Sequence, residues 1–179
     1  MNIYFIRHWE TDRNLKWMIN PWDVDSELNQ TWITQAYESW NNIKTQWLSI
    51  DVIISSPLKR AKKTAEIIAK EIGYKEFIHE IKELEEKYAG IFKDYYKKQF
   101  QEEFWCRIVE EILQKYNDKT FDWVESFKDF KIRIDNAIES IKNNTDFKGK
   151  NILIVSHWWV WEILTWIKKI DNCKLVKIN

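Results

Sequence analysis

Two of the three histidines in this chain stand at the ends of short, mainly apolar segments. His8 follows residues 3–7, and His157 follows residues 152–156. A neutral imidazole is a competent nucleophile near neutral pH, because its unperturbed pKa is about 6.5. It can attack the phosphorus of a phosphate ester if fixed positive charges hold the phosphoryl oxygens.

Arginine can supply these charges. Arg7 precedes the first histidine, and Arg60 lies in a third segment, Ser-Ser-Pro-Leu-Lys-Arg-Ala, over residues 55–61. The chain has five arginines against 23 lysines, so arginine in both segments runs against its composition. Because a planar guanidinium can bind two oxygens at once, Arg7 and Arg60 are the candidates for phosphate binding.

Segments with strand character alternate with helical patterns along the chain. Strands are predicted at residues 3–6, 52–55, 77–79, 152–155 and 175–178. Apolar residues with helical spacing follow Pro57 and Ser126, and a third such stripe runs from Phe100 to Ile112. This alternation predicts an α/β fold.

The predicted strands should bring the candidate residues to one edge of the sheet. His8, Ser56 and His157 each follow a strand, and sites in open α/β sheets lie at the carboxyl ends of the strands. Ser56 also precedes a proline and a helical pattern. We therefore expect Ser56 to cap this helix rather than bind a ligand, with Pro57 as the first helical residue.

Tryptophan and glycine occur in unusual numbers, 12 and 3 respectively. Glycine normally makes up about 7% of a soluble protein. A backbone N–H in a strand-to-helix turn can reach a phosphate only if no side chain intervenes, which favours glycine beside the two histidines. Trp9, Trp158 and Trp159 stand at these places.

With glycine read at these three positions, the chain resembles the histidine phosphatase superfamily, also called the phosphoglycerate-mutase-like family. The family's motifs are Arg-His-Gly-Glu-Thr, Ser-Ser-Pro-Leu-x-Arg-Ala and Ser-His-Gly-Gly, in the order found here. The resemblance covers nearly the whole chain. Eight tryptophans fall on glycine positions of the family: 9, 17, 32, 40, 47, 123, 158 and 159.

The resemblance implies a three-layer α/β/α sandwich with a mostly parallel central sheet, as one catalytic domain over residues 1–179. It also implies that His8 is the nucleophile of a phosphatase and forms a phosphohistidine. Asn14, which follows the first motif, matches the family's phosphate-binding asparagine, and His157 would be a further donor to the phosphoryl group.

The acid that protonates the leaving oxygen and then activates water is assigned to Glu86. Residues 86–90 match the acid-bearing Glu-x-x-x-Gly segment of the family. Glu83 and Glu85 compete for this role, because all three belong to one charged run that could be a solvated face.

Composition excludes several classes of partner. With 28 basic and 28 acidic side chains the net charge is zero, so neither nucleic acid nor a membrane surface is expected to bind. No apolar stretch approaches about 18 residues, and the chain leads straight into a strand, so we expect no membrane span or signal peptide. Cys106 and Cys173 are far apart. We expect a cytoplasmic enzyme for a small phosphorylated metabolite, without metal or cofactor.

Two explanations compete for the tryptophans. In the first, UGA codons that the source organism reads as glycine have been translated as tryptophan; in the second, the tryptophans are real and the protein is a non-catalytic relative. The first is favoured, because one residue type consistently replaces one other. A cofactor-dependent phosphoglycerate mutase is the alternative enzyme, although mutases of the family are usually longer.

The remaining residues of these types have ordinary roles in this interpretation. His79, Arg13, Arg107 and Arg133 are expected to be structural or exposed, because they lie outside the phosphate-binding motifs. If the tryptophans are kept as printed, Trp9, Trp158 and Trp159 should pack around the mouth or floor of the pocket between His8 and His157.

Overall fold

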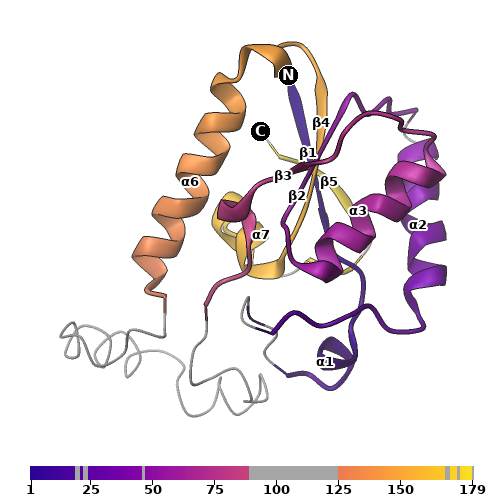
Figure 1. The fold of residues 1–179 in the computed structure, drawn as a ribbon, viewed down its shortest axis with the longest axis vertical. Coiled ribbons are helices and arrows are strands. Elements are labelled where there is room, and N and C mark those ends of the chain that lie inside the picture. Colours follow the sequence, from indigo (N-terminus) through magenta and orange to yellow (C-terminus); the bar gives the residue numbers. More distant parts are fainter. Residues whose placement is uncertain are drawn as a thin grey trace.

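The computed structural model describes residues 1–18, 21, 24–45, 47–88, 125–167, 170–172 and 174–178. Its centre is a five-stranded sheet with the strand order β3-β2-β4-β1-β5 (Figure 1). The strands are β1 (Asn2–Arg7), β2 (Val52–Ser55), β3 (His79–Glu80), β4 (Asn151–Ser156) and β5 (Leu175–Ile178). The predicted stripe from Phe100 to Ile112 lies outside the described residues, as do Cys106, Arg107 and Cys173.

The sheet is mostly parallel, as predicted. β1 pairs with β4, β4 with β2 and β2 with β3 in parallel, and only β5 is antiparallel, against β1. The strands predicted at residues 3–6, 52–55, 152–155 and 175–178 correspond to β1, β2, β4 and β5. The third strand is shorter than predicted and shifted, because only His79 and Glu80 form ladder pairs with β2.

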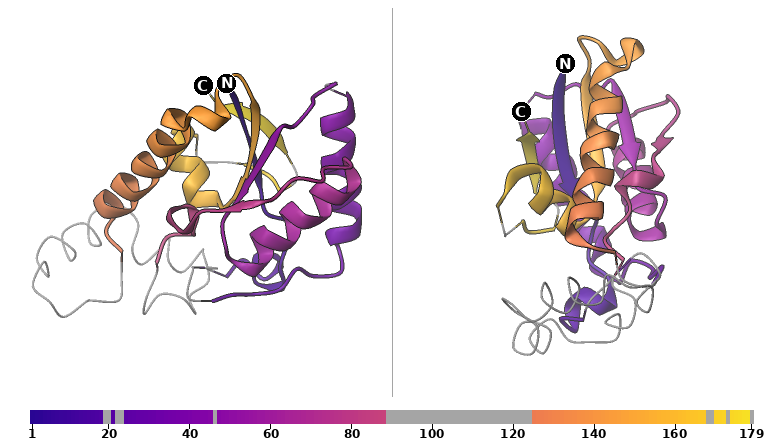
Figure 2. Two further views of the ribbon diagram at one scale, coloured as in Figure 1. Left: turned by 45° about the horizontal axis from the view of Figure 1, so that its top comes forward. Right: turned by 90° about the vertical axis from the view of Figure 1, so that its left-hand side faces the viewer.

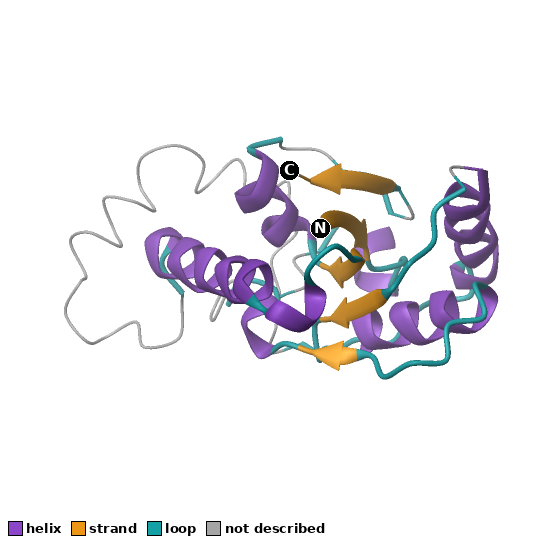
Figure 3. Cartoon of the chain, turned by 90° about the horizontal axis from the view of Figure 1, so that it is seen from above, coloured by secondary structure: helices purple, strands orange, loops and turns teal. Residues whose placement is uncertain are grey.

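Helices cover both faces of the sheet, which confirms the three-layer arrangement. The described helices are α1 (Asp12–Leu15), α2 (Trp32–Thr45), α3 (Lys59–Glu71), α6 (Phe127–Asn143) and α7 (Trp158–Thr165), with 3-10 turns η1 (Lys82–Leu84) and η3 (Thr145–Phe147). Figures 2 and 3 show α2 and α3 on one side of the strands and α6 and α7 on the other. Within the described residues, no helix is long and apolar enough to cross a membrane.

The alternation of side chains along the strands builds two cores. Ile3 and Phe5 of β1 pack with the residues of α6 and α7, whereas Ile6 packs with those of α2 and α3. Neighbouring residues of a strand point to opposite faces, so apolar residues at successive positions are needed when both faces are covered. This explains why the central strands are apolar throughout.

The helix α6 follows the predicted apolar stripe. Phe130, Ile134, Ala137 and Ile141 are buried at helical spacing. The hydroxyl of Ser126 caps the helix by accepting the N–H of Asp129. α6 therefore begins where the sequence placed it.

The start of α3 differs from the prediction. The helix begins at Lys59, its N-cap is Leu58, and Pro57 lies before it. The Ser56 hydroxyl accepts a hydrogen bond from the N–H of Leu58 at 3.3 Å, but it also lies 2.8 Å from Nε2 of His157. The prediction of Ser56 as the helix N-cap was wrong, because its side chain contacts His157 at the neighbouring strand end and the backbone is still extended at Leu58, the residue before the helix.

Tryptophan occupies an unusual backbone conformation at three places. Within the described residues, the non-glycine residues with positive φ are Trp17, Trp47 and Trp166, at 57°, 49° and 59°. These values lie in the left-handed region, where a β-carbon is disfavoured and glycine is the usual residue. Trp166 ends α7 in this conformation, a position that glycine commonly takes.

Candidate active site

The carboxyl ends of three parallel strands place His8, Ser56 and His157 beside one another. β4 lies between β1 and β2, so the residues that follow these strands emerge at the same edge. The ring centroids of His8 and His157 are 5.2 Å apart. The contact of Ser56 with His157 links the ends of β2 and β4 at this edge of the sheet.

The backbone fixes the tautomer of His8. Its Nδ1 lies 2.6 Å from the carbonyl oxygen of Trp9, which can only accept a hydrogen bond. Nδ1 therefore carries the proton, and the lone pair of the neutral ring is on Nε2. The side chain of Asn172 donates to the His8 carbonyl at 2.5 Å, so the turn is held from a second side.

His157 is fully buried, and its surroundings oppose its protonation. Burial lowers its pKa well below 6.5, and the charges of Arg60, His8 and Arg7 act in the same direction. Its Nδ1 has no hydrogen-bond partner among the residues that the structure describes. The ring is therefore neutral at pH 7, and an anion bound beside it would favour the protonated form.

Arg60 provides a buried positive charge. Its side chain is fully buried in α3, and its guanidinium donates to the carbonyl oxygens of Val24 at 2.9 Å and Pro21 at 3.3 Å. Burial lowers the pKa of Arg60 to about 10, while the charges of Glu86 and Asp25 raise it. Arg60 thus stays charged at neutral pH and is held in a fixed orientation.

Arg7 is the last residue of β1 and is only 9% exposed. Its Nη1 donates to the carbonyl of Ile170 at 3.3 Å. The charge of Arg7 lowers the pKa of both His157 and Arg60, so Arg7 belongs to the same cluster of side chains. The structure therefore brings both motif arginines to the two histidines.

Glu86 belongs to this group as well. It follows η1, its side chain is 6% exposed, and its Oε1 accepts the N–H of Lys87 at 3.0 Å. Its charge raises the pKa of Arg60. Of the three competing glutamates, Glu83 is exposed and Glu85 is partly exposed, so Glu86 is the buried member of the run.

Asn14 is the third residue of α1 and forms a capping box with Thr11, the N-cap at the start of the helix. Its side-chain oxygen accepts hydrogen bonds from the N–H and the hydroxyl of Thr11, and its own N–H donates to the Thr11 hydroxyl. The amide oxygen is thus engaged, and Nδ2 is the group that could donate to a phosphate.

The tryptophans beside the histidines lie in different surroundings. Trp9, expected at the pocket, is instead fully buried between α2 and α3, where its indole stacks on Trp32 and donates to Ser39 at 2.9 Å. β1 ends at Arg7, and after the strand end Trp9 packs in the same core as Ile6. Its N–H donates to the Thr64 hydroxyl at 3.1 Å.

Trp158 and Trp159 form the first turn of α7 and are half-buried. Their rings stack at 6.3 Å, and the ammonium of Lys87 lies 5.6 Å from the Trp159 ring. Burial lowers the pKa of Lys87 to about 8. Because Lys87 follows Glu86, Trp159 packs between the His157 turn and the segment that carries the acid.

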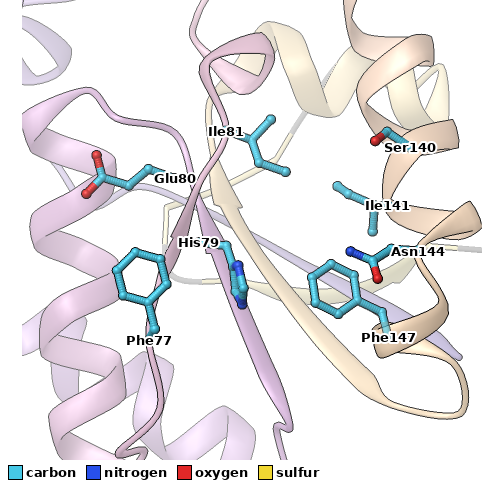
Figure 4. A pocket seen from close by; sticks show the side chains of 8 residues that line it. All are labelled: Phe77, His79, Glu80, Ile81, Ser140, Ile141, Asn144 and Phe147. Carbon is cyan, nitrogen blue, oxygen red and sulfur yellow. The ribbon is translucent and has the colours of Figure 1, made fainter.

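A separate pocket of about 270 Å³ opens at the β3 edge, where Figure 4 shows the side chains of β3 and the end of α6 around it. Its lining is Phe77, His79, Glu80, Ile81, Ser140, Ile141, Asn144 and Phe147. None of these is an arginine or lysine, so the pocket does not suit a phosphate. His79 contacts two phenylalanine rings there, in agreement with a structural role.

Sequence reasoning missed Thr64 and Asn172. Thr64 lies one helical turn after Arg60, donates to the Arg60 carbonyl at 2.7 Å and accepts the Trp9 N–H. A polar residue on the buried stripe of α3 was the available signal. Asn172 had none, because only the fold brings it to His8. No group of three metal-ligating side chains occurs in the described part of the chain.

A mostly parallel α/β sheet with two histidines and two arginines at one edge defines a class of phosphoryl-transfer proteins. The sequence model of the histidine phosphatase superfamily (branch 1) matches residues 3–175, and the chain belongs to this superfamily.

Known proteins of similar sequence agree with this assignment. The chain is 30% identical over 155 residues to PhoE of Bacillus subtilis, which is called an uncharacterized phosphatase. The aligned region covers 87% of this chain and 70% of the relative. It is 25% identical over 172 residues to a broad-specificity phosphatase of Saccharomyces cerevisiae, covering 94% and 70%.

Solved structures show the same fold. The phosphoglycerate mutase of Bacillus anthracis superposes with a TM-score of 0.78 at 22% identity, over 99% of this chain and 86% of the other. A mutant phosphoserine phosphatase of Entamoeba histolytica, solved with phosphoserine, superposes with a TM-score of 0.72 at 25% identity, over 98% and 89%.

Proposed function

We propose that the protein hydrolyses small phosphomonoesters through a phosphohistidine on Nε2 of His8. The observation that carries this proposal is the anchored imidazole: Nδ1 is held by the Trp9 carbonyl, and the ring lies beside His157. Phosphatases among the relatives and the superfamily itself support the same reaction.

The first step transfers the phosphoryl group to the enzyme. Nε2 of His8 attacks the phosphorus, and the bond from phosphorus to the leaving oxygen breaks. Glu86, in its protonated form, donates its proton to that oxygen. Arg7, Arg60, His157 and Asn14 are assigned to the phosphoryl oxygens, whose charge fixed donors stabilise in the transition state.

The second step returns the enzyme to its first state. Glu86, now a carboxylate, takes a proton from a water molecule, whose oxygen attacks the phosphorus of phosphohistidine. The bond to Nε2 breaks, inorganic phosphate leaves, and the lone pair returns to His8. The reaction needs no metal ion in this scheme, because the charges come from arginine and histidine.

Turnover of an aryl phosphate in the presence of EDTA tests the proposal, with glycine at positions 9, 158 and 159. Hydrolysis that survives the chelator and disappears in His8→Ala is the expected result. Full turnover by His8→Ala would exclude His8 as the nucleophile.

A cofactor-dependent phosphoglycerate mutase is the second candidate, favoured by the superposition on a mutase structure. The two functions differ in the fate of the phosphoryl group. Supplied with phosphoglycerate and its bisphosphate, a phosphatase releases phosphate to water, whereas a mutase isomerises the substrate with little free phosphate.

We infer further that the tryptophans at family glycine positions are UGA codons read as glycine in the source organism. The left-handed backbone at Trp17, Trp47 and Trp166 supports this reading and adds position 166 to it. Native peptides that span residues 8–13 and 151–168 should carry glycine at positions 9, 158 and 159. Tryptophan at all three in an active native protein would overturn the inference.

The proposed substrate is a small phosphorylated metabolite, and we place the enzyme in the cytoplasm, where such metabolites are made. Fractionation of the source cells with an antibody tests this placement.

A further inference from the structure

Arg133 lies far from the phosphate-binding motifs in sequence, yet it contacts the segment that carries Glu86. It belongs to α6, and its Nη1 donates to the carbonyl oxygen of Glu83 at 2.7 Å and to that of Glu85 at 3.1 Å. One guanidinium nitrogen therefore binds two carbonyls just before the proposed acid.

Glu125 completes this arrangement from the other side. Its two carboxylate oxygens accept hydrogen bonds from Nε and Nη2 of Arg133, both at 2.8 Å. The same carboxylate accepts the N–H of Tyr88 at 3.2 Å, and the N–H of Glu125 donates to the Tyr88 carbonyl at 3.1 Å. The pair thus holds the backbone before and after Glu86.

A third contact ties this segment to the sheet. The hydroxyl of Ser156 donates to the carbonyl oxygen of Leu84 at 2.7 Å, and Ser156 directly precedes His157. Leu84 itself is fully buried. The acid-bearing segment is therefore fixed relative to the strand end that presents His157.

The geometry of these bonds requires an arginine. The guanidinium spreads its N–H groups in a plane, so it can bind a carboxylate with one edge and backbone carbonyls with another. A lysine has one ammonium and cannot make both sets of contacts. The side chains of Arg133 and Glu125 are 22% and 16% exposed, so water competes little for these bonds.

We propose that Arg133 and Glu125 are positioning residues, which hold the Glu86 carboxyl where it can protonate the leaving oxygen of the substrate. This inference rests on the proposed phosphatase reaction. A displacement of about 1 Å in a reacting group can cost about 10²-fold in rate. Loosening the pair should therefore slow the steps that need the proton of Glu86.

The test compares two substrates whose leaving groups differ strongly in their need for a proton. Arg133→Lys should lower kcat/KM for an alkyl phosphate about tenfold or more, because its alkoxide is a poor leaving group. For 4-nitrophenyl phosphate, whose leaving group departs without a proton, the loss should stay within about twofold. Glu125→Gln keeps one acceptor oxygen and should give a smaller loss of the same pattern.

Asp135→Asn is the matched control, because Asp135 pairs with Lys131 on the exposed side of the same helix. It should leave both substrates unchanged. Equal losses on both substrates in Arg133→Lys and Glu125→Gln, or no loss on either, would overturn the positioning role while the parent enzyme remains active. An inactive parent, or a fully active His8→Ala, would instead refute the proposed function.

If Arg133→Lys does not fold, Glu125→Gln decides the question alone, with thermal unfolding measured beside the kinetics. A folded Glu125→Gln protein that loses more on the alkyl substrate supports the proposal. A folded protein with an unchanged ratio between the two substrates contradicts it.

Discussion

The two histidines of the site end neighbouring strands but are held in different ways. His8 is oriented by its own turn, through the carbonyl of the next residue. His157 is oriented by Ser56, which comes from another strand, and its pKa is lowered by burial and by nearby positive charge. The comparison teaches that a ring fixed by local backbone can serve as a ready nucleophile. A ring fixed by distant groups is instead sensitive to what binds beside it.

The largest expected effect separates these two roles. His8→Ala should abolish turnover and leave no phosphorylated protein, because the nucleophile is gone. His157→Ala should lower kcat by about 10²–10³-fold, the usual cost of losing one fixed donor to the transition state, while a phosphoenzyme still forms. Rapid-quench labelling with a radioactive substrate measures both. Labelled His8→Ala, or unlabelled but folded His157→Ala, would reverse the assignment.

Anion binding should distinguish the histidines next. A bound dianion raises the pKa of His157 from its low value, so binding near pH 7 should take up about one proton. Affinity should then fall as pH rises. Sulfate is a suitable probe, because it stays a dianion throughout this range.

Calorimetry of sulfate binding in buffers of different ionisation enthalpy measures the proton uptake. His157→Gln should remove most of it, and His8→Gln should keep most of it. The opposite pattern would show that His8, not His157, responds to the anion.

The stability of the unliganded protein should also depend on His157. Its pKa is lowered in the folded state, so the unfolded chain binds more protons once the pH falls below about 6.5. Stability is therefore retained above this pH and lost as the pH falls toward the folded pKa, by at most about 1.4 kcal/mol per pH unit.

Urea unfolding at several pH values measures this loss for the parent and for His157→Gln. The variant should show a flatter dependence between about pH 6.5 and 5. Identical slopes in the two proteins would mean that His157 takes up its proton in the folded state as readily as in the unfolded one.

Much of the fold could be predicted because each central strand is apolar on both faces. Residues 52–55 could be placed from sequence alone, and so could the stripe that buries Phe130 and Ile134. The short β3 strand was harder to place, because its two residues are defined by pairing with β2 and have no strong pattern of their own.

The candidate site also has a part that the sequence predicts and a part that only the fold reveals. His8, Arg60 and His157 could be predicted because each has a motif around it, whereas the contact of Ser56 with His157 and that of Asn172 with His8 depend on tertiary structure. Arg133 was expected to be structural, and it does form an ion pair. Its bonds to the acid-bearing segment could not be foreseen, since they span 50 and 48 residues.

The smallest expected effect concerns the tryptophans, which, like the two histidines, lie in different surroundings. Trp9 buries its indole in the core, while Trp47 is 95% exposed and has a positive φ. Trp47→Gly should stabilise the chain as printed by about 1 kcal/mol, because the left-handed conformation costs roughly that much when a β-carbon is present. Trp47→Ala keeps the β-carbon and removes the indole, so it should leave stability nearly unchanged. Thermal unfolding compares the three proteins, and a gain in Trp47→Ala equal to that in Trp47→Gly would mean that the exposed indole, not the backbone, is the source of the cost.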